Sequence, residues 1–195
     1  MEKKERYITW STKRKLGEIT TGANFSENQI QNLVEPNIIL EIDHSAATFL
    51  LKNCNFHKVV HKSNHLIISQ SILGELELNH KQAVRINDNS NIGKVKLEGN
   101  GNYEGDLTLG IQGNCSINEL KLIKSQINSL SINNSEVKSF ILVGSRCNKL
   151  ILEKFLSNEF QFFDTLIGDL SVSDTDFGRS IFSKSHSSIQ TFTYR

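Results

Sequence analysis

Residues 120–152 read LKLIKSQINSLSINNSEVKSFILVGSRCNKLIL, and this stretch decides the fold. Two residues separated by one recur every five positions: Leu120-x-Leu122, Ser125-x-Ile127, Leu130-x-Ile132, Ser135-x-Val137, Phe140-x-Leu142, Ser145-x-Cys147 and Leu150-x-Leu152. The first member alternates between a large apolar residue and serine, so the full repeat is ten residues. A helix needs apolar residues at steps of three and four, and an ordinary strand needs unbroken alternation. A solenoid repeats such positions because every coil presents them inward.

The same spacing extends in both directions from this stretch. It continues as Phe160-x-Phe162, Thr165-x-Ile167, Leu170-x-Val172, Thr175-x-Phe177 and Ser180-x-Phe182. Before residue 115 it is less regular, with pairs such as Leu40-x-Ile42, Phe49-x-Leu51, Val59-x-His61, Leu66-x-Ile68, Leu76-x-Leu78 and Val95-x-Leu97. The spacing slips near Ser63 and at polar insertions such as residues 98–102. We expect these insertions to be loops that leave the corners of the coils, where binding specificity usually lies.

This pattern resembles the pentapeptide-repeat family. In that family the central residue of each five is large and apolar, like Ile127 or Val137 here, and the residue two before it is small, like Ser125 or Ser135. The resemblance covers roughly residues 40–187 and is strongest after residue 115. It implies an all-β solenoid, a right-handed parallel β-helix with four faces and about 20 residues per coil.

The chain departs from the family pattern at every second small position, which Leu120, Leu130, Phe140 and their equivalents occupy. We infer a flattened, rectangular cross-section from these large residues. Two other solenoids remain open. Residues 117–127 also match a leucine-rich repeat with serine in place of asparagine, although such repeats need 20–29 residues and this motif restarts after ten. The other alternative is a three-faced β-helix.

Residues 1–37 are expected to form an N-terminal cap, and residues 38–195 the solenoid. Residues 7–10 and 19–21 are rich in strand-forming types and predict a hairpin. Residues 26–34 begin with Ser-Glu-Asn-Gln, the spacing of a capping box, and predict a short helix. A cap is needed because the open end of a solenoid exposes ladder hydrogen bonds and apolar side chains.

Composition limits the class of protein. The 195 residues suit one domain, and the net charge of +1 lacks the basic surplus that nucleic-acid binding requires. No stretch approaches the roughly 20 apolar residues of a membrane span, and the N-terminus lacks the apolar run of a signal peptide. Three widely spaced cysteines favour a reducing compartment over a disulfide framework. We therefore expect a cytoplasmic protein that binds neither nucleic acid nor membrane.

One cluster has residue types that bind metal. Cys54, His57, His61 and His65 would supply four zinc ligands if they shared one helical face. The surrounding Phe56, Val59 and Val60 instead favour extended chain, in which His61 points inward or sits at a corner while the other two histidines face solvent. These four residues remain candidates only, because their spacing matches no established zinc motif. No cofactor is expected.

A second set of polar residues recurs near the five-residue step: Asp164, Asp169, Asp174 and Asp176. Recurring acids on a β-helix suggest a carbohydrate-active enzyme or a calcium groove. The simpler interpretation is that this position of the repeat faces water. No nucleophile is flanked by a base and an orienting acid at a recognisable spacing, so no catalytic residue is assigned.

These observations favour a non-enzymatic protein-binding or scaffolding module. Residues 192–195 show no polar cap, which predicts that the last coil stacks on a protein partner, on another copy of the chain or on a missing continuation of the chain. Some proteins that this chain resembles mimic DNA and bind type II topoisomerases, a role that depends on a strongly negative surface. Residues 101–195 carry nearly equal numbers of acids and bases, so this alternative is weaker.

Overall fold

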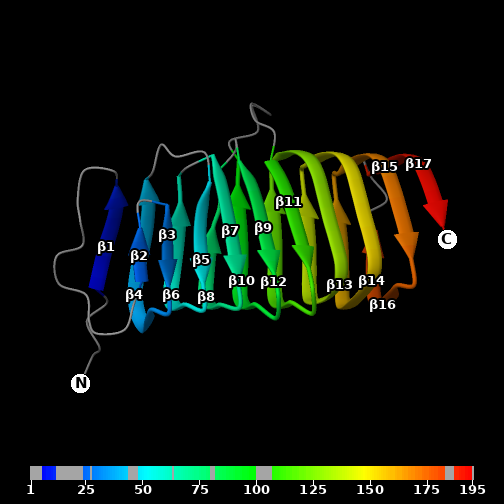
Figure 1. The fold of residues 1–195 in the computed structure, drawn as a ribbon. Helices are drawn as coiled ribbons and strands as arrows, with labels where there is room; N and C mark the ends of the chain where they lie inside the picture. The colour runs from blue at the N-terminus through cyan, green and yellow to red at the C-terminus, as the bar shows by residue number, and fades with distance from the viewer. Residues whose placement is uncertain are drawn as a thin grey trace, which may run out of the picture.

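Every regular element of the described residues is a β-strand, and together they form a rod (Figure 1). The computed structural model describes residues 6–11, 24–26, 28–43, 48–62, 64–79, 82–99, 107–182 and 187–194. The strands are β1 (Arg6–Ser11), β2 (Asn24–Ser26), β3 (Gln29–Gln31), β4 (Val34–Asp43), β5 (Phe49–Lys52), β6 (Asn55–His61), β7 (His65–Ser69), β8 (Ile72–Glu77), β9 (Ala83–Asn87), β10 (Asn91–Glu98), β11 (Leu107–Gln112), β12 (Ser116–Ile123), β13 (Gln126–Val143), β14 (Arg146–Phe163), β15 (Leu166–Ser173), β16 (Asp176–Phe182) and β17 (Ser188–Tyr194).

The strands wind into a parallel solenoid of about seven turns. Strand β10 pairs in parallel with β8 and β12, while β11 pairs in parallel with β9 and β13, so alternate strands belong to opposite sides of the rod. Residues 114–174 form coils of uniform length, and we call this part of the rod the regular half. There Ile127 lies beside Cys147, and Cys147 beside Ile167, each 20 positions further along the chain. The predicted β-solenoid with coils of about 20 residues is confirmed.

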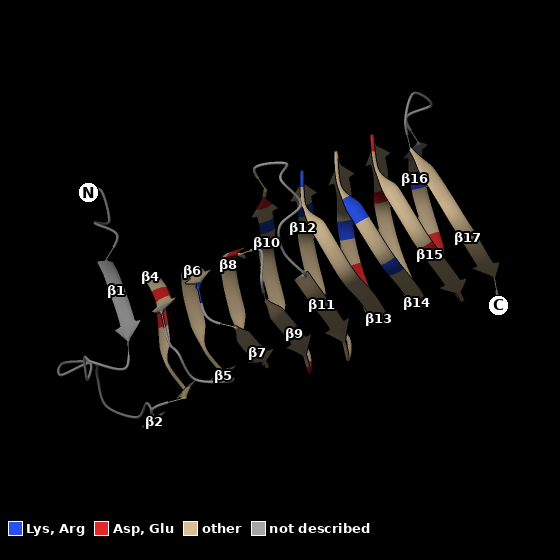
Figure 2. Ribbon diagram, turned by 90° about the horizontal axis from the view of Figure 1, so that it is seen from above, with Lys and Arg blue, Asp and Glu red and all other residues tan. Residues whose placement is uncertain are grey.

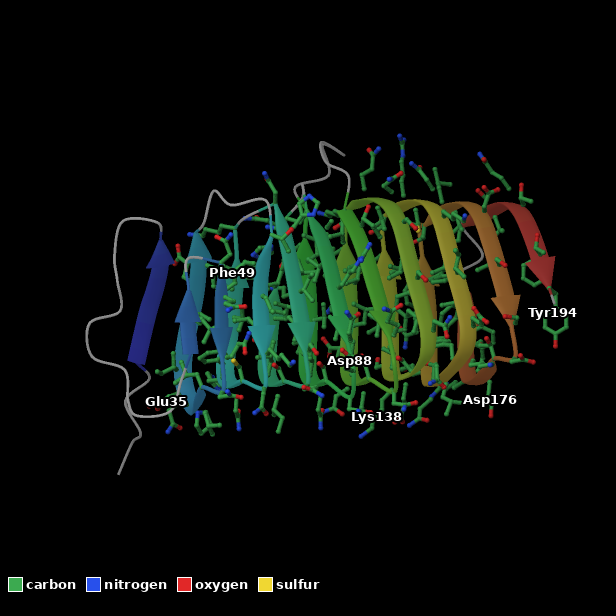
Figure 3. All side chains as sticks on the ribbon, in the orientation of Figure 1. Glu35, Phe49, Asp88, Lys138, Asp176 and Tyr194 are labelled. Atoms are coloured by element: carbon green, nitrogen blue, oxygen red, sulfur yellow. The ribbon has the colours of Figure 1, made fainter. Side chains whose placement is uncertain are left out.

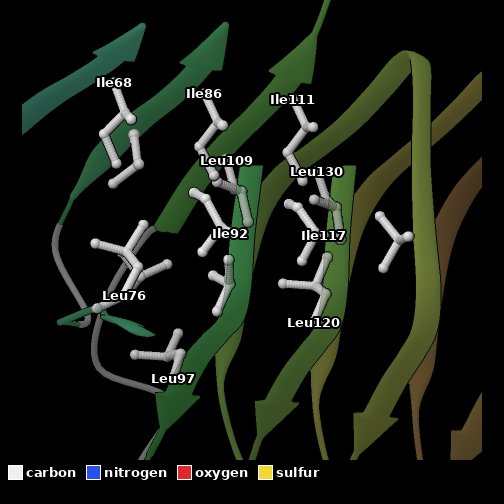
Figure 4. Packing of buried hydrophobic residues seen from close by; sticks show 14 of the residues in the cluster. Ile68, Leu76, Ile86, Ile92, Leu97, Leu109, Ile111, Ile117, Leu120 and Leu130 are labelled. Atoms are coloured by element: carbon white, nitrogen blue, oxygen red, sulfur yellow. The ribbon is translucent and has the colours of Figure 1, made fainter. Parts of the chain in front are cut away.

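Aliphatic and aromatic residues stack in columns along the interior. Figure 4 shows one such column, in which Ile68, Ile86 and Ile111 come from successive coils and lie side by side. Ile127, Ile132 and Val137, which the five-residue spacing places inside, are completely buried. Each fully buried side chain of this kind contributes roughly 1.5–3 kcal/mol. The predicted inward positions are therefore confirmed.

Sharp corners recur every ten residues in the regular half. They are marked by residues with positive φ: Asn114, Lys124, Asn134, Gly144, Lys154, Asp164 and Asp174. Between two corners the chain runs as one extended side of about eight residues. Midway along each side, two consecutive residues interrupt the alternation of buried and exposed positions. Two sharp corners in each coil give a flattened cross-section, as the large residues at the alternate positions suggest.

Buried hydroxyls close these corners by bonding to the backbone. The Ser145 hydroxyl accepts a hydrogen bond from the Ser125 N–H at 3.2 Å and donates to the Val143 carbonyl at 3.0 Å. The Ser135 hydroxyl accepts from the Cys115 N–H of the preceding coil in the same way. At these two corners the serine hydroxyl therefore satisfies a backbone donor that the turn removes from the strand ladder.

The helix predicted at residues 26–34 is wrong. Apart from residue 27, which lies outside the described residues, this segment is strand and turn. Strand β3 pairs antiparallel with β2 and parallel with β5, and Asn32 has a φ of 58° at the first corner. Ile30 and Leu33 fit the helical spacing, but both are buried as the first inward residues of the solenoid. Tertiary pairing therefore overrides the local capping signal.

Only part of the predicted N-terminal hairpin can be followed. Its first half lies in strand β1, which pairs in parallel with β4 rather than with a hairpin partner. Its second half, residues 19–21, lies outside the described residues. The division of the chain into a cap and a solenoid stays a prediction.

The larger changes in coil length fall at one corner, which we call the variable corner. Four connections there differ in length: β4 to β5, β6 to β7, β8 to β9 and β10 to β11. Each of them leads from the side of the rod that contains β10 to the side that contains β11. The insertion at residues 98–102 belongs to the last of these connections, and residues 100–106 lie outside the described residues. The opposite corner, which we call the constant corner, differs by at most one residue in length from Asn53 to Asp174.

Candidate interaction surface at the C-terminal end

The last coil leaves both sides of the solenoid with an open edge. Strand β16 pairs with β14 and strand β17 pairs with β15, and no other described strand lies beyond either of them. We call the surface formed by β16 and β17 the end face. Backbone N–H and C=O groups along such an edge are free to pair with another strand.

Core side chains lie uncovered on the end face. Ile189, Phe192 and Tyr194 stack on the inward residues Ile167, Leu170 and Val172 of the preceding coil, yet their exposed fractions are 39%, 60% and 73%. Figure 3 shows Tyr194 at the far end of the rod. The equivalent residues one coil earlier are buried because a further coil covers them.

Aromatic residues fill the core directly beneath this surface. The ring centroid of Phe177 lies 4.7 Å from that of Phe160 and 6.0 Å from that of Phe155, and Phe160 in turn contacts Phe140 at 5.1 Å. Tilted and edge-to-face contacts of this kind each add about 0.5–1.5 kcal/mol to burial. The end face therefore rests on a packed aromatic base and presents a defined apolar surface.

Strand β17 carries none of the residues that usually protect a sheet edge. Its sequence SIQTFTY has no charge and no proline, and isoleucine, threonine, phenylalanine and tyrosine all favour strands. The charged residues of β16 are Asp176 and Arg179. Figure 2 shows β17 without coloured segments, whereas charges are interspersed along the preceding strands.

The structure does not bring the four residues considered as zinc ligands together in one cluster. His61 is completely buried, while His57 and His65 are exposed, as the extended interpretation predicts. Cys54 is buried at a corner, where its thiol contacts the carbonyls of Ile30 and Lys52. Among the described residues, no three side chains of His, Cys, Asp or Glu lie close enough together to hold a metal ion.

The aspartates considered as a catalytic set are spread around the rod. Asp164 and Asp174 occupy opposite corners with φ near 47° and 46°, a conformation that aspartate tolerates better than most residues. Asp169 lies on β15 and Asp176 on β16, on opposite sides. The recurrence of these residues therefore follows from the positions of corners and outward residues.

The three thiols are buried and unpaired. Burial raises the pKa of all three, that of Cys147 to about 12. A thiol with a raised pKa holds its proton at neutral pH and is a poor nucleophile. Cys54, Cys115 and Cys147 therefore serve as small core residues, as their inward positions predict.

Sequence reasoning missed a ladder of alternating charges on one side of the rod. Lys58, Glu75, Lys94 and Glu119 occupy the same position in four successive coils. Ion pairs join Lys58 to Glu75 at 3.0 Å and Lys94 to Glu119 at 2.8 Å. Exposed pairs contribute only about 0–1 kcal/mol each, so the ladder mainly opposes a shift in register. The irregular coil lengths hide this signal in the sequence.

No protein-family model, no curated protein and no solved structure matches this chain. Within the described residues, no helix has the length and apolar character needed to cross a membrane.

Proposed function

We propose that the protein is a non-enzymatic protein-binding or scaffolding module, a β-helix of pentapeptide-repeat type that binds through its end face. One observation carries the proposal: the end face exposes two strand edges together with the apolar side chains Ile189, Phe192 and Tyr194. Open edges bind added strands through the backbone, and adjacent apolar side chains provide affinity and specificity.

The architecture suits this role because the binding surface is held in place before a partner arrives. The ladder runs without interruption from β12 to β17, and Phe155 and Phe160 pack beneath the last coil. A surface that is already ordered loses less conformational entropy on binding.

The pentapeptide-repeat assignment is supported by the spacing of buried residues. From Cys115 to Val172 a small or large inward residue is followed two positions later by a second inward residue, and this unit repeats every five positions. A cytoplasmic location is supported by the three unpaired thiols, which suit a reducing compartment.

Affinity capture from a lysate of the native host tests the proposal. The wild-type chain, a Tyr194→Glu variant and a Leu166→Glu variant are each immobilised, and retained proteins are identified by mass spectrometry. Leu166 is an exposed apolar residue on the side of the rod, so its substitution controls for the added charge. We expect the wild type and Leu166→Glu to retain the same proteins and Tyr194→Glu to lose them. No retention above the bare matrix, or equal retention by all three chains, would contradict the proposal.

A further inference from the structure

We propose that one side of the rod binds the same side of a second copy of this chain, with the two rods antiparallel. The surface consists of the outward residues of β6, β8, β10 and β12, and we call it the charged side. These strands follow one another along the rod (Figure 1) and pair in parallel. The charged side is separate from the end face, so this contact goes beyond the proposed function.

The charges of this side form a pattern that is complementary to itself. In the first outward column, the residues from β6 to β12 are positive, negative, positive and negative: Lys58, Glu75, Lys94 and Glu119. In the next column, two positions further along each strand, they are uncharged, negative, positive and positive: Val60, Glu77, Lys96 and Lys121. Read from β12 back to β6, the first column has the opposite sign at every position. Two such faces attract when one is turned end to end against the other.

A two-fold axis that crosses the rod between β8 and β10 gives this arrangement. It places residues of opposite charge against each other across the two copies: Lys58 against Glu119, Glu75 against Lys94, and Glu77 against Lys96. The symmetry repeats each contact. Lys121 lies opposite Val60, so no charge in these two columns faces a like charge.

Like charges disfavour the other ways of bringing the two sides together. If the rods lay parallel, each charge of the first column would face the same charge of the second copy. An antiparallel axis placed on β8 brings Lys58 opposite Lys94, and one placed on β10 brings Glu75 opposite Glu119. Like charges held together across an interface cost free energy. The charge pattern therefore selects both the direction of the rods and the register.

The middle of the charged side allows the two faces to approach closely. Gly74 and Gly93 lie beside each other midway along β8 and β10, one on each side of the axis. Each therefore lies opposite the other in the second copy, and neither has a side chain to hold the faces apart. Ile72, which is 53% exposed, lies opposite Asn91 and adds apolar contact area.

The charged side chains are ordered before the second copy binds. Ion pairs within one chain already hold most of them: Lys58 with Glu77 at 2.6 Å, Lys94 with Glu119 at 2.8 Å and Lys96 with Glu98 at 2.9 Å. Side chains that are already ordered lose less conformational entropy on binding. The second copy adds a further opposite charge to each pair and joins the separate pairs into a network.

The size of the charged side predicts a weak dimer. Four coils spaced by about 4.8 Å, with sides of about eight residues, cover about 500 Å² on each copy. Both copies together bury about 1,000 Å², at the low end of specific interfaces. The dimer leaves its two end faces pointing in opposite directions, so that it would hold two partners at once.

Sedimentation equilibrium at about 0.05 M and about 0.5 M sodium chloride tests whether the dimer forms and depends on charge. We expect the wild type to dimerise at low salt, with a dissociation constant at least about tenfold weaker at high salt. The matched control Tyr194→Glu changes the end face and should dimerise as the wild type does. A wild-type chain that stays monomeric at every concentration in low salt overturns the inference, as does a dimer that Tyr194→Glu abolishes.

A mixing experiment tests the contact between Glu77 and Lys96. Glu77→Lys makes this part of the face wholly positive, and Lys96→Glu makes it wholly negative. Each variant alone should dimerise at least about tenfold more weakly than the wild type, because like charges then face each other across the axis. An equimolar mixture should restore dimers with one chain of each kind, since both contacts then join opposite charges.

This rescue separates contacts between copies from contacts within one chain. A loss of the ion pairs inside a chain cannot be repaired by adding a second chain, and Lys58 keeps its ion pair with Glu75 at 3.0 Å in the Glu77→Lys variant. Far-UV circular dichroism confirms that each variant is folded. A mixture that stays as weak as the separate variants overturns the pairing, as do single variants that dimerise normally.

Cross-linking tests the register. Asn55 and Ser116 are the first residues of β6 and β12 and occupy one column, so Asn55 should lie opposite Ser116 of the second copy. A short bismaleimide reagent should join a mixture of Asn55→Cys and Ser116→Cys chains, and the three native thiols are buried. Asn55→Cys alone should not be joined, because its two copies lie about 14 Å apart along the rod. Efficient linkage of Asn55→Cys to itself overturns the register.

Discussion

His61 is the residue least suited to its surroundings. It lies beside the inward residue Ile42 of the neighbouring coil, and it is completely buried. Neither ring nitrogen has a hydrogen-bond partner. Burial, assisted by the charge of His65, lowers the pKa of His61 to about 4. His61 is therefore neutral in the folded protein and gains a proton readily only when the chain unfolds.

We predict that His61 makes the protein sensitive to acid. The unfolded histidine titrates near 6.5, so the free energy of unfolding should fall as the pH drops from about 6.5 to 4, by up to about 3 kcal/mol below that window. Substitution His61→Leu should remove this loss and raise stability at pH 7 by about 1–3 kcal/mol, because no polar group is then buried without a partner. Urea unfolding at pH 7, 5 and 4 measures both effects.

The control for this prediction is His57→Gln, which changes an exposed histidine of the same strand. It should leave the difference between pH 7 and pH 4 unchanged. An acid sensitivity that persists in His61→Leu would show that other groups cause it.

Gly93 and Gly110 provide a second comparison at the residue scale. A Cβ on Gly93 would lie 2.4 Å from the Gly74 carbonyl oxygen of the neighbouring coil, whereas one on Gly110 would meet only the Arg85 side chain at 3.9 Å. We expect Gly93→Ala to destabilise by about 1–3 kcal/mol through forced separation of two coils. Gly110→Ala should be neutral or stabilise slightly. Equal stabilities in guanidinium unfolding would contradict this explanation.

At the scale of elements, the corners join the two sides of each coil. Residues with positive φ mark the constant corner from Asn32 to Asp174 and the variable corner at Lys124, Gly144 and Asp164, and asparagine fills many of these positions. The Asn134 side chain donates to the Asn114 side chain at 2.7 Å, and Asn53 donates to Asn32 at 2.8 Å. These side-chain hydrogen bonds link the corners of neighbouring coils along the rod. Gly144 occupies one corner and lysine occupies two others.

We predict that Lys154→Gly stabilises the protein. Lys154 has a φ of 47°, a conformation that costs a side chain with a Cβ about 1–2 kcal/mol and glycine very little. Part of this gain is lost through the greater freedom of glycine in the unfolded chain, so we expect a net increase of up to about 1 kcal/mol. Lys149→Gly, in the middle of a strand, should instead destabilise. Thermal unfolding of both variants checks the opposite signs.

The corner hydroxyls give a further prediction. Ser145→Ala removes the acceptor for the Ser125 N–H and leaves that buried donor unsatisfied. We expect a loss of about 1–3 kcal/mol. Ser131→Ala, on an outward position of the adjoining strand, is the matched control and should change stability by less than about 0.5 kcal/mol. Chemical unfolding that shows no difference between the two would contradict the role of the hydroxyl.

At the scale of the whole molecule, the rod accommodates large changes in length at the variable corner and changes of a single residue at the constant corner. Connections at the variable corner differ in length, yet the strands on both sides keep their parallel partners in neighbouring coils. A longer loop there adds only a slowly growing entropy cost, about 0.6 kcal/mol for each doubling. At the constant corner, backbone bonds such as Asn114 N–H to the Asn134 carbonyl join neighbouring turns directly.

We therefore predict different effects of the same insertion at the two corners. Four glycine and serine residues placed within 100–106 should lower the free energy of unfolding by less than about 1 kcal/mol. The same insertion beside Lys154 should cost considerably more, because it breaks the stacking of turns on both neighbouring coils. Denaturant unfolding of the two variants, with circular dichroism to confirm the fold, makes the comparison.

The predictability of this fold depended on how regular each segment is. Residues 115–172 repeat without interruption, so the inward positions of Ile127, Ile132 and Val137 followed directly from their spacing. The helix at residues 26–34 was wrong because a capping signal and two apolar residues also suit the first coil of a solenoid. The sequence shows no polar cap at residues 192–195, but the exposure of Phe192 and Tyr194 emerged only once the coils were stacked.

The sequence by itself determined that this chain winds into coils of about 20 residues, because the five-residue spacing is local and repeats on every side. Only the tertiary structure decided which residues meet across coils. The alternating charges of Lys58, Glu75, Lys94 and Glu119 and the isolation of His61 both depend on coil lengths that vary from turn to turn. Contacts between coils follow from register, and register is set by the packing of the whole rod.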